Sequence, residues 1–185
     1  PDRDHDYRAD EVITWATGRR RPGGIALKDG DLYVADINVV LKFADIEQHL
    51  TPQAPYKVVF DGLPSDGHHG LKYLRFAPDG SLTIPVGAPC NICDPKLPYA
   101  AIHSLNLDTG KLSLLARGVR NSVGFDYHPV TGELWCTDNG RDMPGNEIPP
   151  EELNRVTHAG QDYGYPYFPA GPIADQDCGR GQKAM

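Results

Sequence analysis

The sequence lacks any long hydrophobic run, and it lacks the extended helical periodicity of an α-helical protein. No apolar stretch in its 185 residues approaches the roughly 20 residues that cross a membrane. The formal net charge is −7, so the chain also lacks the basic footprint of a nucleic-acid-binding protein. The remaining composition, 39% hydrophobic and 23% charged residues, is that of an ordinary globular domain. We therefore expect neither a membrane span nor a nucleic-acid partner.

An initiating methionine and a signal peptide are also missing. The chain begins Pro-Asp-Arg-Asp, which is typical of an excerpt or a processed product. The absence of a signal therefore does not indicate a compartment.

Glycine and proline are abundant instead. The 20 glycines and 17 prolines form 20% of the chain, against about 12% in average proteins. They separate short strand-like runs, and the helix candidates are limited to Ala44–His49 and a segment near Pro149–Leu153. This pattern predicts an all-β protein with many turns.

The strand-like runs repeat along the chain. Each repeat is a strand, a turn containing glycine and a second strand, followed by a third strand candidate. The leucines of the second strands lie 50 and 52 residues apart, at Leu32, Leu82 and Leu134. A period near 40–50 residues with paired strands is typical of β-propeller blades. The blade-like units are 19–60, 66–115 and 118–168, followed by an irregular tail, 169–185.

Three units do not close a propeller, which has about 4–8 blades. We therefore expect the chain to be part of a longer protein or to be completed by other copies.

Polar residues crowd the ends of the third hairpin. Its strands are predicted at Val123–Tyr127 and Glu133–Thr137. Arg120 and Asn121 precede the first strand, and the segment 138–142, Asp-Asn-Gly-Arg-Asp, follows the second. A hairpin does not need such groups at its ends, whereas a site built on strand-end loops does.

The ordered set of motifs resembles the soluble quinoprotein sugar dehydrogenases, above all their sorbosone dehydrogenase-like branch. The match runs from about Arg19 to Tyr167 and rests on Arg-Asn at 120–121, Asp-Asn-Gly at 138–140, Glu-Leu-Asn at 152–154 and Gly-Tyr-Pro at 164–166. The resemblance implies a six-bladed β-propeller that uses pyrroloquinoline quinone (PQQ) and calcium to oxidise sugars. About three of the six blades would lie in this chain.

The resemblance also implies roles for individual residues. His68 matches the base of the family's Asn-His-x-Gly segment, two residues before Gly70, although Gly67 replaces the asparagine. A histidine suits proton removal because its ordinary pKa is near 6.5. The alternative is that His68 and His69 are both solvated loop residues.

Arg120 and Asn121 match the family's quinone-binding pair. A guanidinium binds carboxylates through paired donors, and PQQ carries three carboxylates. Calcium would bind the backbone carbonyls of Gly140 and Arg141, where related glucose dehydrogenases have Gly-Pro. Acidic residues nearby also offer oxygens, namely Asp138, Asp142, Glu147, Glu151 and Glu152.

The four cysteines do not form a zinc pattern, because Cys90 and Cys93 are not matched by a second close pair. No βαβ setting supports a thioredoxin-like role. We expect a local disulfide between Cys90 and Cys93 in an oxidising compartment, with reduced thiols as the alternative. Cys136 lies at a position of the strand's alternating pattern that faces inward, and it is expected to be buried as a small apolar residue.

The resemblance implies a PQQ-dependent sugar dehydrogenase of the glucose or sorbosone type, which we expect to be periplasmic or secreted. His68 would deprotonate a sugar or aldehyde substrate, and a quinone or cytochrome would accept the electrons. One alternative is a calcium-dependent, lactonase-like propeller hydrolase in which Asp138 and Asn139 hold the metal. Another is a non-enzymatic propeller that binds protein partners.

Overall fold

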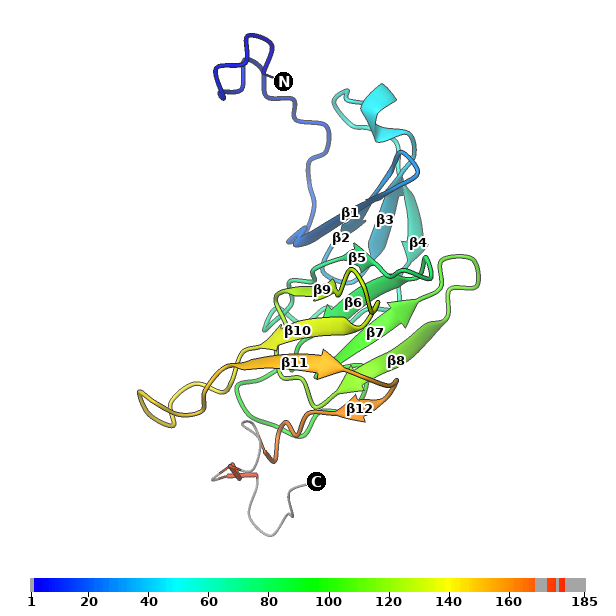
Figure 1. The fold of residues 1–185 in the computed structure, drawn as a ribbon. Helices are drawn as coiled ribbons and strands as arrows, with labels where there is room; N and C mark the ends of the chain where they lie inside the picture. The colour runs from blue at the N-terminus through cyan, green and yellow to red at the C-terminus, as the bar shows by residue number, and fades with distance from the viewer. Residues whose placement is uncertain (1, 169–172, 176, 179–185) are drawn as a thin grey trace.

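A computed structural model describes residues 2–168, 173–175, 177 and 178 (Figure 1). Its regular elements are β1 (Gly24–Lys28), β2 (Asp31–Ala35), β3 (Val40–Phe43), the 3₁₀ helix η1 (Ile46–Gln48), β4 (Lys57–Phe60), β5 (Arg75–Phe76), β6 (Leu82–Val86), β7 (Ala101–Leu105), β8 (Leu112–Arg117), β9 (Phe125–Tyr127), β10 (Leu134–Asp138), β11 (Glu152–Val156) and β12 (Gln161–Asp162). The described part contains no α-helix, so the all-β prediction is confirmed. Nor does it contain a helix that is long and apolar enough to cross a membrane.

The strands form three antiparallel meanders. The first sheet has the order β1-β2-β3-β4, the second contains β5-β6-β7-β8, and the third has the order β11-β10-β9. Strand β12 follows the third meander along the chain but pairs in parallel with β8 of the second sheet. The predicted unit 118–168 therefore contributes strands to two sheets. Most of the predicted tail, 169–185, lies outside the described residues.

The repeat expected from the leucines is present. Leu32, Leu82 and Leu134 each lie in the second strand of a meander, and all three are buried. The turn before Leu32 shows why Asp-Gly occurs there. Asp29 has a φ of 53° and Gly30 a φ of 85°, the left-handed pair that a two-residue hairpin turn requires.

The two helix predictions had different outcomes. The segment Ala44–His49 contains η1, a single 3₁₀ turn. The helix predicted near Pro149–Leu153 is wrong, because β11 begins at Glu152. Glu152 and Leu153 pair with residues of β10, and this long-range pairing overrides the local helix-start signal.

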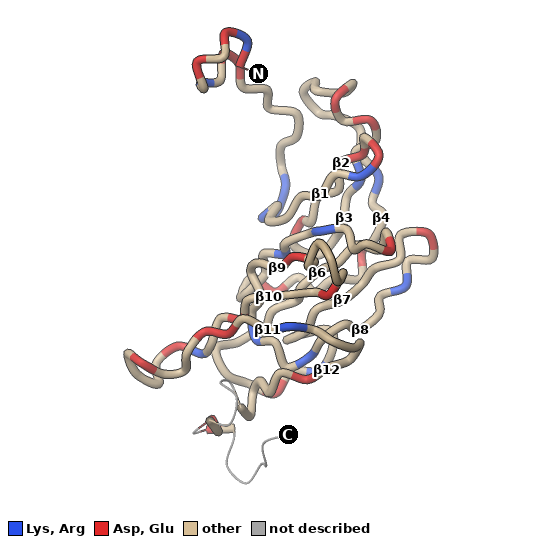
Figure 2. Tube along the Cα trace, viewed as in Figure 1, with Lys and Arg blue, Asp and Glu red and all other residues tan. Residues whose placement is uncertain are grey.

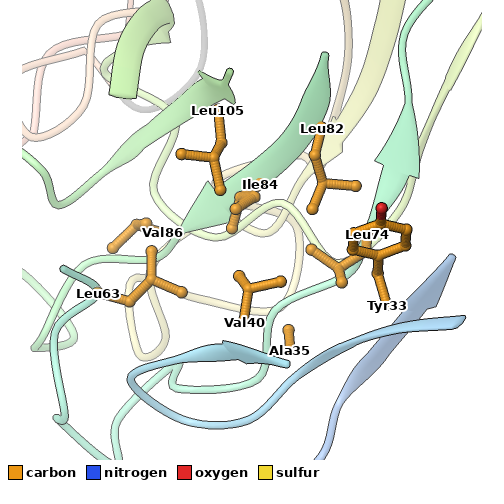
Figure 3. Packing of buried hydrophobic residues seen from close by; sticks show 9 residues of the cluster. All are labelled: Tyr33, Ala35, Val40, Leu63, Leu74, Leu82, Ile84, Val86 and Leu105. Carbon is orange, nitrogen blue, oxygen red and sulfur yellow. The ribbon is translucent and has the colours of Figure 1, made fainter. Parts of the chain in front are cut away.

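The sheets pack against each other through their apolar faces. Between the first and second sheets, Val40 of β3 meets a cluster that includes Leu82 and Ile84 of β6 (Figure 3). Between the second and third, Ile102 of β7 packs with a cluster that includes Cys136 of β10. Cys136 is 1% exposed, as expected from its strand position.

This arrangement also determines where a site can form. In a meander, alternate loops leave the same end of the sheet. The β4–β5, β6–β7, β8–β9 and β10–β11 loops therefore meet at one end of neighbouring sheets. These loops carry the histidines, the cysteine pair, the Arg-Asn pair and the acidic segment that the sequence singles out.

Candidate functional site

The strand register places three residues at equivalent positions of the three repeats. The first and second strands pair through Leu27 with Leu32, Phe76 with Leu82, and Tyr127 with Leu134. Seven residues before the first member of each pair stand Arg20, His69 and Arg120. His69 therefore corresponds by position to Arg120, whereas His68 corresponds to Val119.

The backbone of Ala88, in the β6–β7 loop, joins His69 to Arg120. The Ala88 N–H donates to the carbonyl oxygen of Arg120 at 2.8 Å. The His69 ring donates from Nδ1 to the carbonyl oxygen of Ala88, also at 2.8 Å. His68 is exposed, and its ring centroid lies 4.1 Å from that of His69. The structure therefore fixes the His69 side chain and brings it to the Arg120 loop.

Gly87 brings His69 next to Asn121. A Cβ atom at Gly87 would lie 2.5 Å from the Cβ of His69 and 3.0 Å from Oδ1 of Asn121. No side chain fits between them, so this position requires glycine. Among the described residues, no hydrogen-bond partner reaches the Asn121 side-chain amide. An imidazole and an uncommitted amide thus lie on the two sides of Gly87.

The hydrogen bond of His69 fixes its tautomer. A carbonyl oxygen only accepts, so the proton is on Nδ1 and the lone pair is on Nε2. Burial lowers the pKa of His69 below 6.5, and the charge of Arg120 contributes in the same direction, whereas the bond to Ala88 raises the pKa. The imidazole is therefore neutral at neutral pH and can accept a proton at Nε2.

Arg120 is buried, with 3% of its surface exposed. Its Nε donates to the backbone oxygen of Asn91 at 2.8 Å, and Nη2 donates to Oδ1 of the same residue at 2.8 Å. Nη1 donates to the backbone oxygen of Asn139 at 3.0 Å. Asp142 lies 3.7 Å from Nη2 and is largely exposed. The guanidinium has five N–H groups, so three are used by these oxygens and two remain.

The carboxylate of Asp138, at the end of β10, shapes the Arg120–Asn121 backbone. Its Oδ2 accepts from the Arg120 N–H at 2.8 Å, and Oδ1 accepts from the Asn121 N–H at 2.7 Å. Burial raises the pKa of Asp138 to about 7, although both N–H groups act to lower it. Asp138 therefore has a structural contact on each of its oxygens.

Lys72 is a buried cation that no sequence motif singled out. Its Nζ donates to the carbonyl oxygens of Ile37 at 2.7 Å and Gly70 at 2.9 Å. Burial lowers the pKa of Lys72 to about 8. These bonds join the β2–β3 loop to the loop of His69 and limit where that histidine can move.

Gly140 and Arg141 lie in the β10–β11 loop, beyond Asn139. The Gly140 N–H donates to Glu151 at 2.8 Å. The Arg141 side chain points to Asp175 and Asp177, with Nη1 2.8 Å from an oxygen of each. Hydrogen bonds to these two carboxylates raise the pKa of Arg141. The Arg141 side chain thus binds the C-terminal segment, while its backbone is part of the β10–β11 loop.

Cys90 and Cys93 form a disulfide, as the sequence predicts. The closed loop has Asn91, the partner of Arg120, within it. Tyr165, which is 5% exposed, binds this loop, because its hydroxyl oxygen accepts from the Cys93 N–H at 3.1 Å. The disulfide loop is therefore part of the same cluster as Arg120 and His69.

Comparisons with known proteins address the fold of the chain. No protein-family model matches the chain. An uncharacterized protein of Borreliella burgdorferi is 31% identical over 167 residues, which cover 85% of this chain and 44% of that protein. A calcium structure of a family AA12 carbohydrate-active enzyme from Trichoderma reesei aligns with a TM-score of 0.72 and 21% identity, over 87% of this chain and 51% of that one.

A third match is the holo form of the PQQ domain of pyranose dehydrogenase from Coprinopsis cinerea, with a TM-score of 0.60 and 15% identity, over 74% of this chain and 40% of that one. The chain has the fold of these enzymes. It is all-β and forms part of a β-propeller. It spans about half the length of the proteins that it matches.

Proposed function

We propose that this chain carries the catalytic histidine and part of the cofactor site of a PQQ-dependent sugar dehydrogenase. The observation that carries the proposal is the Ala88 peptide, which connects a neutral imidazole to a buried arginine at one end of the sheets. The likeness to a PQQ domain and to a carbohydrate-active enzyme supports the same reaction class.

The donors at this point are of the kind that PQQ requires. PQQ carries carboxylates and quinone oxygens, which are hydrogen-bond acceptors. Arg120 has two N–H groups beyond the three that bind Asn91 and Asn139, and Asn121 has an uncommitted amide. We assign these two residues to cofactor binding. Because Arg120 is buried and held by the protein, it would offer a fixed charge rather than a mobile clamp.

His69 is better placed than His68 to act as the base. The Nε2 lone pair of His69 would accept the hydroxyl proton of the sugar, and Ala88 would hold the ring while the proton moves. The C–H hydrogen leaves with its electron pair. Bound PQQ would supply the two-electron acceptor for that hydride. Transfer of the proton to His69 and of the hydride to the cofactor balances the oxidation of an alcohol to a carbonyl.

We also propose that the site binds calcium, and that backbone carbonyl oxygens are its ligands. In the part of the chain that the structure describes, the one group of three acidic side chains close enough to share an ion is Asp2, Asp4 and Asp10. That group is exposed and lies on the N-terminal segment, away from the sheets (Figures 1 and 2). The carbonyls of Gly140 and Arg141 remain our proposed ligands, since a hard cation accepts backbone oxygens.

The hydrolase alternative has less support. It requires Asp138 and Asn139 to hold a metal with their side chains. Both oxygens of Asp138 already accept backbone N–H groups, and its carboxyl is buried. We propose a sugar or related aldehyde as the substrate and a quinone or cytochrome as the electron acceptor. The Cys90–Cys93 disulfide supports a periplasmic or secreted location, because disulfides persist in oxidising compartments.

The test compares two neighbouring histidines in the complete gene product. His69→Ala should bind PQQ, added with calcium, but reduce it about 10²–10⁴-fold more slowly with sugar, because the proton acceptor is lost. His68→Ala is the matched control and should react within about threefold of the parent. A reductive half-reaction on cofactor-saturated protein measures both rates.

A slow His68→Ala with a normal His69→Ala would return the base to His68. Failure of the parent to bind PQQ would refute the quinoprotein proposal.

A further inference from the structure

Asn91 makes contacts that no local turn requires. Its Oδ1 accepts from Nη2 of Arg120 and from the backbone N–H of Asp142, both at 2.8 Å. Its Nδ2 donates to the backbone oxygen of Asp142 at 3.2 Å, and its own backbone oxygen accepts from Nε of Arg120 at 2.8 Å. One side chain and one peptide oxygen thus connect the β6–β7, β8–β9 and β10–β11 loops.

The two contacts with Arg120 form a fork. Nε and Nη2 lie on one edge of the planar guanidinium, so binding both to Asn91 fixes the rotation as well as the position of that plane. An N–H group of Nη1 donates to the backbone oxygen of Asn139. Asn91 therefore determines in which direction the two unused N–H groups of Arg120 point.

Asn91 lies within a loop that a disulfide closes. Cys90 and Cys93 close the short loop around it, and Tyr165 binds the Cys93 N–H. The start of the loop is attached to the same arginine, because the Ala88 N–H donates to the Arg120 carbonyl. A cross-link that closes such a loop reduces the number of conformations that the loop can adopt, so Asn91 has fewer alternative positions.

We propose that Asn91 is a positioning residue for the cofactor site, and that the Cys90–Cys93 disulfide is required to keep it in place. Asn91 acts through Arg120 and through the backbone of Asp142. This inference rests on the proposed PQQ site, and it adds that the orientation of Arg120 comes from a loop of the neighbouring blade.

The experiment uses substitutions in the complete gene product, because thiol reductants would also reduce a quinone. Asn91→Ala removes the side-chain bonds, and Asn91→Asp keeps oxygens that accept from Arg120 and from the Asp142 N–H. Cys90→Ser combined with Cys93→Ser opens the loop. Asn106→Ala is the matched control, since the Asn106 side chain accepts three hydrogen bonds in the turn between β7 and β8, at the other end of the sheet.

The dissociation constant of PQQ is the first readout. Asn91→Ala and the double serine variant should weaken PQQ binding by about 10–100-fold, as expected for loss of a charge-assisted hydrogen bond. Asn91→Asp should restore binding to within about threefold of the parent. Asn106→Ala should lower thermal stability without changing the PQQ dissociation constant. Parent-like PQQ binding in Asn91→Ala, or an Asn91→Asp variant no better than alanine, would overturn the inference.

Amide hydrogen exchange without cofactor is the second readout. In Asn91→Ala the Asp142 amide should exchange at least tenfold faster, and in Asn106→Ala it should not change. If the parent fails to bind PQQ, the proposed function is wrong while this readout still tests the positioning role of Asn91. An unchanged Asp142 amide would refute that role.

Discussion

The loops that precede the first and third meanders follow the same plan but have different surroundings. In both, an aspartate at the end of the second strand accepts the N–H of an arginine: Asp36 from Arg20 at 3.0 Å, and Asp138 from Arg120 at 2.8 Å. Both aspartates are buried. Arg20 is exposed, however, and no residue in the described part of the chain binds its guanidinium. Arg120 is enclosed and bound by Asn91 and Asn139.

This difference separates the scaffold from the site. The contact between the aspartate and the arginine N–H occurs in both the first and the third repeat, so it belongs to the scaffold of these blades. Burial of the arginine requires a second blade, which contributes the disulfide loop and Asn91. The middle repeat has His69 at the same position and Val86 in place of the aspartate. A candidate site therefore forms where one blade's loop is completed by its neighbour.

The largest expected effect comes from removing the aspartate that binds the arginine N–H in the first and in the third repeat. Asp138→Ala leaves the N–H groups of Arg120 and Asn121 without an acceptor, at about 1–3 kcal/mol for each buried group. Asp36→Ala leaves only the Arg20 N–H without one, because the Ile37 N–H also donates to the Arg20 carbonyl oxygen at 3.1 Å. Both variants should lower the thermal midpoint. Only Asp138→Ala should also weaken PQQ binding, by at least about 100-fold, because it releases Arg120 and Asn121 together. Equal losses of PQQ affinity in the two variants would show that the repeats are functionally equivalent.

A smaller effect is expected from exchanging the arginines for lysine. Lysine keeps the charge but lacks the planar fork that binds two oxygens of Asn91. Arg120→Lys should raise the PQQ dissociation constant by about tenfold or more, which corresponds to at least about 1.4 kcal/mol. Arg20→Lys should leave it unchanged. Equilibrium titration of PQQ into each variant measures the difference, and a parent-like Arg120→Lys would mean that charge alone is sufficient.

Local patterns were enough to predict the strands and the disulfide. The Asp-Gly turn at 29–30 and the leucine spacing depend on neighbouring residues, and the structure confirms the meanders they predict. The helix near Pro149–Leu153 failed because β10 lies beside this segment in space and not in sequence. Contacts with Arg120 made by Asn91 and Ala88 join residues about 30 positions apart, so no local pattern contained them.

Our proposal of His69 rather than His68 as the base rests on the strand register and on the contacts of His69. His68 and His69 are adjacent and chemically identical, and the family motif, with one mismatch, matches His68. Aligning the three repeats on their paired leucines places His69, and not His68, at the position of Arg120. The internal alignment therefore supports the proposal of His69, whereas the family motif predicts His68.

The smallest expected effect is electrostatic, and it tests whether the charge of Arg120, and not that of Arg20, acts on the pKa of His69. Burial and then the charge of Arg120 lower the pKa of His69, so its protonation occurs below pH 6.5. As the pH falls through that pKa, Nε2 takes up a proton and the imidazole ceases to be a base.

Arg120→Met should therefore raise the pKa of His69, and Arg20→Met should leave it unchanged. Chemical shifts of the His69 ring protons, followed by NMR against pH in cofactor-free protein, report this directly, with His68→Ala used for assignment. His68 and Asp142 also act on this ring, in opposite directions, and both are retained in the two arginine variants. If the pKa of His69 rises equally in the two arginine variants, Arg20 acts on His69 as strongly as Arg120 does. The two loops would then differ only in their hydrogen bonds.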